Sequence, residues 1–509
     1  MNDILLLLPE FVLLISAFVI FILDLLWKKQ PEKAGMFPVL ALLGSLAAFA
    51  ATIFLWMSGG IRLDIIATDS GNQVPMLAVD QFALFFKAYV ALTLAFVSVI
   101  ATDYIRARTP FRGEFYALTI MAGLALMLVA SSVNLVMIFL AFEFLSITSY
   151  LLTGYLRDDE LSIEAALKYF LYGSVASAVM LFGFSLIFGA TGSVDLVGIA
   201  QGLAKADHTI TTFLVFPSLV LIIVGLGFKI ALVPFHQWSP EAYQGAPTPI
   251  TAFLSVGPKA AGFALMARIL TIAFPAFAAS ANVSWIVILS GIAMLTMTFG
   301  NVVALWQKDI KRLFAYSSIA QAGYMLIGVV AIAPQYVGGS PEVVGWPQGL
   351  NGLLMYLLAY LFTNIGVFAI IIAMENKTGS TAINSYAGLI KRSPYLAVAF
   401  LIFLLSLIGI PPTAGFIGKL FVFGAAITQG MFVLAFVAII NSVISVYYYL
   451  GISRQMFFTQ SDDTSPIAVS GPLNAVVTIT LVLVLAMALW AQPFIDWTTN
   501  SAQIIASSF

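Results

Sequence analysis

Fourteen stretches of this chain are apolar over a length that can cross a lipid bilayer, and no other feature limits the fold as strongly. A membrane helix needs about 20 mostly apolar residues. Inside the hydrocarbon every backbone polar group must be hydrogen-bonded within the protein, so such stretches form α-helices. The predicted spans are Ile4–Trp27, Met36–Met57, Met76–Ala101, Glu114–Val129, Val133–Tyr155, Ile163–Gly189, Thr211–Tyr243, Pro249–Leu270, Val283–Leu305, Leu313–Ile332, Leu350–Met374, Tyr395–Ile427, Met431–Leu450 and Pro472–Trp490. The sequence therefore predicts an all-α polytopic membrane protein with about 14 transmembrane helices.

Composition excludes several classes of function. Hydrophobic residues make up 61% of the chain and charged residues only 9%, whereas a soluble domain carries about 25% charged residues. A net charge of −1 offers no basic surface for nucleic acid. With no cysteine and only two histidines, we expect no metal site and no iron–sulfur cluster on this chain. No nucleotide-binding glycine loop occurs, so any redox chemistry belongs to partner chains.

Basic residues between the spans are distributed unevenly. Of the 22 lysines and arginines, 16 lie between spans, and all but two of these fall in odd-numbered loops. The two exceptions are Arg62 and Lys205. Basic loops face the cytoplasm, so the odd-numbered loops define a basic face that is predicted to be cytoplasmic. Both termini are then on the non-cytoplasmic side.

Two spans are interrupted, the seventh at Val233–Pro234 and the twelfth within Ser406–Lys419. They lie five spans apart, so each is the fourth helix of a five-helix unit if helices 4–8 and 9–13 are repeats. An odd number of crossings makes consecutive copies inverted, and matched broken helices mark the working region of inverted-repeat transporters. We therefore predict domains at 1–113, 114–271, 282–451 and 472–509, the middle two being the inverted repeats.

Buried ionisable side chains are the candidates for chemistry, because charge at mid-membrane is costly and is kept for function. Glu143 lies at the centre of the fifth span and must be protonated, paired or hydrated. It could equally be a permanently neutral acid that links two helices. Lys229, one turn before Pro234, is its natural partner. A Glu143–Lys229 pair could open and close to drive proton transfer, or it could be a static packing contact.

Two further lysines lie within apolar spans. Lys259 is near the middle of the eighth span among small residues such as Gly257 and Gly262, which leave room for water or for close helix contact. It cannot easily extend to the interface, unlike a lysine near a helix end. Lys419 follows the second break and is the only basic residue of its span. Buried lysines of this kind are suitable proton carriers.

Supporting residues are more ambiguous. Lys168, one turn after Glu164, lies near the basic end of the sixth span and either forms a peripheral ion pair or belongs to the proton path. His236 follows the first break and either relays protons or satisfies free carbonyls there. Asp80 and Lys87, two turns apart, suggest a structural pair. Arg268 is at a span end and is predicted to be interfacial.

Three motifs connect these residues to a known family. They are FHQWSPEAYQGAPTPITAFLSVGPKAAGF, DIKRLFAYSSIAQAGYMLIG and LSLIGIPPTAGFIGK. The first resembles subunit N of NADH-quinone oxidoreductase, respiratory complex I, one of three antiporter-like subunits related to multi-subunit Na⁺/H⁺ antiporters. The other two resemble further hallmarks of that family. With the 14 spans, the resemblance covers almost the whole chain, and lysine in VGPKAA favours subunit N over its sister subunits.

The resemblance implies inverted repeats of helices 4–8 and 9–13, broken helices 7 and 12, and a proton channel. The channel residues it implies are Glu143, Lys229, Lys259 and Lys419, with Lys168 and His236 in support. FMN, iron–sulfur clusters and quinone are expected on partner subunits, and sister antiporter-like subunits are expected beside this chain. The setting is an energy-transducing membrane, the bacterial inner or plasma membrane. Two alternatives stay open: a subunit of a cation/proton antiporter, and a non-pumping membrane scaffold.

Overall fold

The computed structural model describes residues 3–58, 64–69, 72–206, 208–277, 284–332, 335–337, 340–342, 349–461, 463 and 465–506. Arg62, the predicted span start at Val283 and the outermost residues of both chain ends lie outside these ranges. Twelve helices among the described residues are long and apolar enough to cross a membrane. They are α1 (Leu8–Leu26), α2 (Phe37–Met57), α3 (Gln81–Arg108), α4 (Arg112–Ser131), α5 (Leu135–Thr153), α6 (Glu160–Thr191), α11 (Thr248–Arg268), α12 (Trp285–Ala304), α13 (Ile310–Val330), α14 (Gly349–Thr378), α18 (Phe432–Phe458) and α19 (Gly471–Leu489).

Four shorter helices form the two interrupted spans. The first break separates α9 (Phe216–Lys229) from α10 (Trp238–Gly245), and the second separates α16 (Pro394–Ile408) from α17 (Ala414–Thr428). Both predicted interruptions are therefore present. The Val233–Pro234 and Pro411–Pro412 peptide bonds are cis.

The remaining elements are shorter than the membrane-spanning helices. Those on the chain before the second half are η1 (Asp3–Leu7), η2 (Pro31–Met36), β1 (Asp64–Asp69), β2 (Asn72–Ala78), α7 (Leu196–Leu203), α8 (His208–Ile210), η3 (Thr211–Val215), η4 (Ile269–Ala273) and η5 (Pro275–Phe277). Those after it are β3 (Gln335–Val337), β4 (Ser340–Glu342), η6 (Ile383–Tyr386), α15 (Leu389–Arg392) and α20 (Gln492–Ala506). The strands form two antiparallel hairpins, β1–β2 and β3–β4.

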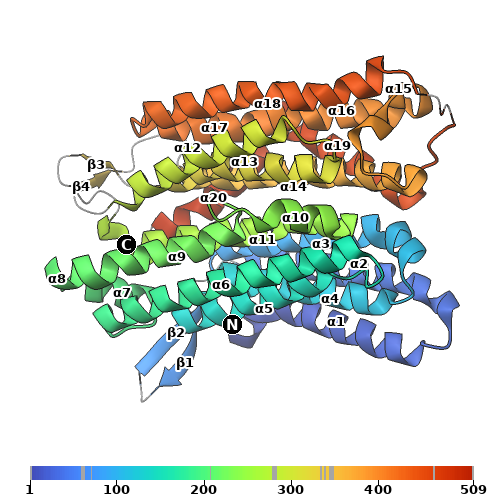
Figure 1. Cartoon of the computed structure of the whole chain (residues 1–509). Coiled ribbons are helices and arrows are strands. Elements are labelled where there is room, and N and C mark those ends of the chain that lie inside the picture. The colour runs from blue at the N-terminus through green and yellow to red at the C-terminus, as the bar shows by residue number, and fades with distance from the viewer. Residues whose placement is uncertain are drawn as a thin grey trace.

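The long helices run side by side, with α1 to α9 in one half of the molecule and α12 to α18 in the other (Figure 1). Both hairpins lie at one end of the bundle, and α15 lies at the opposite end. Helix α14 packs against α3, α11 and α13, and α11 packs against α3 and α13. The most apolar windows of α11 and α14 are completely buried, although the chain is alone here. These helices therefore form the core of the bundle and expose little surface to lipid.

Polar side chains begin several of these helices. Asp80, Asn134, Asp159 and Asp309 accept hydrogen bonds from backbone N–H groups in the first turns of α3, α5, α6 and α13. Such caps satisfy N–H groups that have no partner within the helix. In an apolar chain these four residues fix where the helices start, and thereby the depth of every side chain along them.

The starts of α5 and α13 share a backbone arrangement. Before and at the start of α5, Val133 and Leu135 exchange hydrogen bonds of 3.1 and 2.8 Å with the segment after α6. Before and at the start of α13, Lys308 and Ile310 exchange hydrogen bonds of 3.0 and 2.8 Å with the segment after α14. Each helix is thus fastened by a short antiparallel bridge to the loop that follows its successor.

Two predicted roles of charged residues are wrong. Arg268 is not interfacial: it is 1% exposed, and its guanidinium pairs with both carboxylate oxygens of Asp80 at 2.6 and 2.8 Å. Asp80 therefore does not pair with Lys87. Lys87 instead pairs with buried Glu10 of α1 at 2.8 Å. Residues seven positions apart lie on one face of a helix, but that face also packs against neighbouring helices. Here those helices supply the partners, Arg268 for Asp80 and Glu10 for Lys87.

The Asp80–Arg268 pair predicts a large loss of stability on truncation. Arg268→Met leaves a buried carboxylate unpaired, which costs about 3–5 kcal/mol. We expect a lower thermal midpoint of the solubilised protein, and the double variant Arg268→Met/Asp80→Asn is expected to recover part of the loss because asparagine is neutral and still caps α3. Arg106→Met, at an exposed position, is the control. Equal thermal midpoints for Arg268→Met and Arg106→Met would contradict this account.

Candidate functional site

The first group of predicted site residues lies between α5, α6 and α9. Lys229 is the last residue of α9 and is 1% exposed. Its amine donates a 3.1 Å hydrogen bond to the Ser146 hydroxyl and lies 5.1 Å from the Phe142 ring centre. Ser146 and Phe142 flank Glu143 on α5, so the structure brings Lys229 to the part of α5 that carries Glu143.

Glu143 and Lys229 do not form a direct ion pair in this structure. The Lys229 amine donates instead to the Ser146 hydroxyl. Oε1 of Glu143 is buried and has no hydrogen-bond partner. Glu143 is half-buried, on a face of α5 that also exposes Leu140 and Ile147. The predicted pair is therefore open, with its acid turned partly outward.

Lys168 belongs to a peripheral ionic network. Its amine contacts Glu164 at 2.6 Å, as its helical spacing predicted, and also Glu241 of α10 at 3.2 Å. Arg312 of α13 contacts the other oxygen of Glu241 at 2.9 Å. The side chain of Lys168 is 39% exposed, so the network lies at the boundary of the bundle. It links helices of both halves near the first break.

The first break is held by residues other than His236. Trp238 donates from its indole nitrogen to the Phe228 carbonyl at 2.7 Å, and this carbonyl at the end of α9 also accepts from the Ala231 N–H at 3.1 Å. Thr296 of α12 accepts from the Val233 N–H at 3.0 Å. The imidazole of His236 is buried edge-on against Phe299 of α12, and its Nδ1 has no hydrogen-bond partner. The Phe228 carbonyl is thus capped by Trp238, which sequence reasoning did not single out for this role.

Lys259 lies at the centre of the second group. It is 1% exposed on α11, and its amine donates a 2.6 Å hydrogen bond to the Ser318 carbonyl of α13. The Ser318 hydroxyl accepts from Tyr360 at 2.9 Å and lies 3.1 Å from the Tyr243 hydroxyl. The small residue Gly262 allows close helix contact, because a Cβ there would lie 2.4 Å from the Ile230 side chain. Lys259 therefore has neutral hydrogen-bond partners only.

Lys419 is bound at the second break. Its amine donates to the Ile408 carbonyl at 2.8 Å and to the Ser442 hydroxyl of α18 at 3.0 Å, and it lies 4.5 Å from the Tyr324 ring centre. Ile408 is the last residue of α16, so this carbonyl has no acceptor role within its own helix. Lys419, like Lys259, is held by a backbone carbonyl and a hydroxyl-bearing neighbourhood.

Polar residues of α13 connect the two lysines. Gln321 donates to the Leu407 carbonyl at 3.1 Å, one residue before the carbonyl that binds Lys419. It also donates to Tyr449 at 3.4 Å and accepts from Tyr356. The Tyr449 hydroxyl lies 2.5 Å from that of Ser317, the neighbour of Ser318. A buried line of polar groups therefore runs from Lys259 along α13 to Lys419; we call it the α13 polar line.

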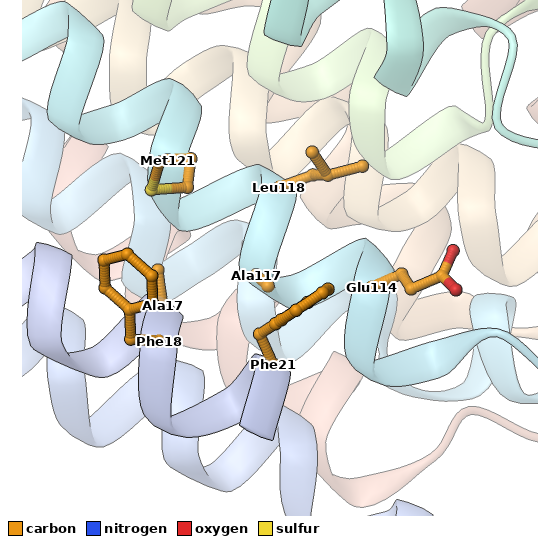
Figure 2. A pocket seen from close by; sticks show the side chains of 7 residues that line it. All are labelled: Ala17, Phe18, Phe21, Glu114, Ala117, Leu118 and Met121. Atoms are coloured by element: carbon orange, nitrogen blue, oxygen red, sulfur yellow. The ribbon is translucent and has the colours of Figure 1, made fainter. Parts of the chain in front are cut away.

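Among the described residues no group of three or more histidine, cysteine, aspartate or glutamate side chains could hold a metal ion. A groove of about 330 Å³ lies elsewhere, between α1 and α4. Figure 2 shows it lined by Ala17, Phe18, Phe21, Glu114, Ala117, Leu118 and Met121. None of the predicted site residues lines this groove.

Comparison with known proteins identifies the family. The profile of the NADH:quinone oxidoreductase/Mrp antiporter transmembrane family matches residues 132–445. NADH-quinone oxidoreductase subunit N 2 of Symbiobacterium thermophilum is 42% identical, over 84% of each chain. The subunit N 2 of Chloroherpeton thalassium is 40% identical over 94% of this chain and 90% of its own.

The chain belongs to the subunit N family of NADH-quinone oxidoreductases. A chain of respiratory complex I from Thermus thermophilus with bound aureothin has the same fold, with a TM-score of 0.77 and 30% identity. The alignment covers 96% of this chain and 98% of that one. The antiporter-like membrane fold expected from the motifs is confirmed.

Membership of the subunit N family gives the motifs a structural meaning. The segment Asp309–Gly328 forms α13 and its cap, and it supplies Ser317, Ser318 and Gln321 to the α13 polar line. This segment is one of the three sequence motifs, but the sequence alone predicted no role for these three residues. Two adjacent serines and a glutamine in a span that must be buried were the available signal.

Replacement of Trp238 tests how the first break is held. Trp238→Phe removes the indole hydrogen bond to the Phe228 carbonyl, which keeps only its 3.1 Å bond from the Ala231 N–H. The loss of one such hydrogen bond costs about 0.5–1.5 kcal/mol. We expect faster amide hydrogen exchange between residues 230 and 238. Trp285→Phe is the matched control, because this indole also donates to a backbone carbonyl, that of Phe274 at 3.1 Å. Unchanged exchange in Trp238→Phe would mean that other contacts hold the break.

Proposed function

We propose that this chain is the proton-translocating membrane subunit of a complex I-type NADH-quinone oxidoreductase. The observation that carries the proposal is the α13 polar line, which joins Lys259 to Lys419 through the buried core. Membership of the subunit N family supports the same function. Redox energy released on other subunits is converted here into movement of protons.

Proton transfer in this scheme passes between amines and hydroxyl groups. Lys259 and Lys419 are bound by carbonyls and hydroxyls, not by carboxylates. A buried ammonium ion without an acidic partner is not fixed in place by an ion pair, so it can pass its proton to a neighbouring acceptor. Tyr449, Ser317 and water molecules between them carry the proton from one lysine to the other.

The region around Glu143 and Lys229 provides the contact with neighbouring subunits. The Glu143 carboxyl is half-buried in a stripe of α5 that exposes Leu140, Ile147 and Leu151. A carboxylate facing lipid at this depth is costly, so we propose that a sister antiporter-like subunit covers this face. Closure of the Glu143–Lys229 pair then depends on the state of that neighbour. Lys168 and His236 support the same region of the path.

We assign the remaining chemistry of the enzyme to other chains. FMN, the iron–sulfur clusters and the quinone site belong to partner subunits, and this chain carries no redox centre of its own. The chain is an integral protein of an energy-transducing membrane, with both termini on the non-cytoplasmic side. The position of basic residues in odd-numbered loops supports this orientation.

The domain division is also part of the proposal: helices 1–3 at 1–113, repeats at 114–271 and 282–451, and a C-terminal part at 472–509. The shared bridges at the starts of α5 and α13 support the two repeats. Counted from the caps Asn134 and Asp309, Ser318 stands where the first repeat has Glu143. Gln321 likewise stands where the first repeat has Ser146, the partner of Lys229.

Two other functions make different predictions. A cation/proton antiporter subunit would transport protons in exchange for sodium without any redox partner. A scaffold subunit would need its buried lysines for assembly only. Copurification in mild detergent with a flavin- and iron–sulfur-containing arm supports the oxidoreductase.

Replacement of Lys259 tests the proposed function. In Lys259→Met the amine is lost at similar side-chain volume, and proton-transfer groups typically contribute about 10²–10⁴-fold to a rate. We expect protons pumped per electron by the assembled complex to fall at least several-fold, measured in proteoliposomes with quinone as acceptor.

Lys87→Met is the matched control for this experiment. It also removes a buried lysine, but one that pairs with Glu10 away from the α13 polar line. We expect less assembled complex and normal pumping per electron in what assembles. Normal pumping in Lys259→Met would refute the proposal, and sodium-dependent proton movement without quinone reduction would favour the antiporter.

A further inference from the structure

Helix α11 carries a stripe of hydroxyl side chains that the proposed function does not use. Thr248, Thr251 and Ser255 precede Lys259 at intervals of three, four and four residues. Such intervals put side chains on the same face of a helix, about 5–6 Å apart. All three hydroxyl residues are buried. The stripe therefore leads from the first turn of α11 to the amine of Lys259.

Each member of the stripe makes a polar contact with another element. Thr251 donates to the Tyr243 carbonyl at 2.9 Å. Ser255 accepts from the side-chain amide of Asn364 on α14 at 2.5 Å. The hydroxyl of Tyr243 in turn lies 3.1 Å from that of Ser318, whose carbonyl binds Lys259. Gaps of one helical turn between neighbouring hydroxyls are the size that single water molecules bridge.

A carboxylate stands at the outer end of the stripe. Thr248 donates to Oε2 of Glu375 at 2.5 Å. Glu375 lies in the last turn of α14, which also contains Lys377. Its side chain is 12% exposed, so the carboxylate borders both the water on the basic face and the buried hydroxyls.

The groups around Glu375 fix its two oxygens differently. On α3, Tyr104 donates to Oε1 at 2.9 Å and Arg108 lies 3.4 Å from the same oxygen. Buried Lys311 of α13 donates instead to the Ala246 carbonyl at 2.7 Å. Oε2 is left to Thr248. The ion pair therefore holds one oxygen toward α3 and aims the other at the stripe.

We propose that Glu375 is the entry group that takes protons from the basic face and delivers them along the α11 hydroxyl stripe to Lys259. This inference rests on the proposed function. A proton from water binds the Glu375 carboxylate and is passed to Thr248. Each hydroxyl and bridging water accepts one proton and releases one, the neutral Lys259 amine becomes ammonium, and the carboxylate is regenerated. No other reactant is consumed.

Glu375→Gln in the intact complex tests the entry role. The amide keeps the shape and can still contact Thr248 and Tyr104, but it cannot take up a proton. In proteoliposomes we expect proton pumping to be several-fold slower than wild type at mildly alkaline pH, where protons are scarce. The defect should shrink at mildly acidic pH and on addition of sodium formate, because formic acid can carry protons to the stripe.

Glu114→Gln is the matched control. Glu114 is another acid at the basic end of the bundle, paired with Arg157 at 3.2 Å, but it lies on α4 at the groove of Figure 2. We expect pumping at the wild-type rate at every pH. A defect of Glu375→Gln that is equal at all pH values and insensitive to formate would overturn the entry role, since a purely structural ion pair predicts that result.

Variants of the stripe keep the test decisive if Glu375→Gln does not assemble. Ser255→Ala is expected to slow pumping several-fold, whereas Ser98→Ala, which removes a buried hydroxyl bonded only within α3, should not. Wild-type pumping in Ser255→Ala would refute the stripe. If Lys259→Met abolishes pumping while Ser255→Ala and Glu375→Gln resemble wild type, only this inference fails. If Lys259→Met also pumps normally, the proposed function fails.

Discussion

The hydrogen bond from the Lys259 amine to the Ser318 carbonyl is the contact on which the polar interior depends. At 2.6 Å it joins α11 to α13, two helices that are almost entirely buried. It holds a potentially charged group in the core without a carboxylate. Tyr243 and Tyr360 bind the hydroxyl of the same residue, Ser318, and so hold the acceptor residue in place. A hydrophobic residue at position 259 would leave the Ser318 carbonyl without this donor.

The two helix breaks extend this principle. A helix that ends inside the membrane leaves carbonyl groups without partners. At the first break the Phe228 carbonyl accepts from the Trp238 indole and from the Ala231 N–H, and Lys229 donates to Ser146 of α5. At the second break Gln321 and Lys419 take two consecutive carbonyls. Each broken helix thus has one buried lysine beside its break: Lys229 ends α9, and Lys419 of α17 binds the last carbonyl of α16.

The sequence was sufficient for the spans, both breaks and the buried lysines, because apolar length, proline and the cost of buried charge act locally. It was insufficient for the partners of those lysines. Ser318, Gln321 and Tyr449 are neutral and inexpensive to bury, and only tertiary packing brings them together. Asp80 and Lys87 show the opposite error, since their spacing suggested a pair while Arg268 and Glu10 on other helices are the actual partners. Glu375 was overlooked because its role depends on contacts with α3 and α11.

The most direct measurement is a structure of the intact complex at a resolution that shows ordered water along the α13 polar line. The account predicts an unbroken series of hydroxyls and water molecules from Lys259, past Ser318 and Tyr449, to Lys419. A dry apolar gap on this line, with ordered water on a different route through the subunit, would contradict it.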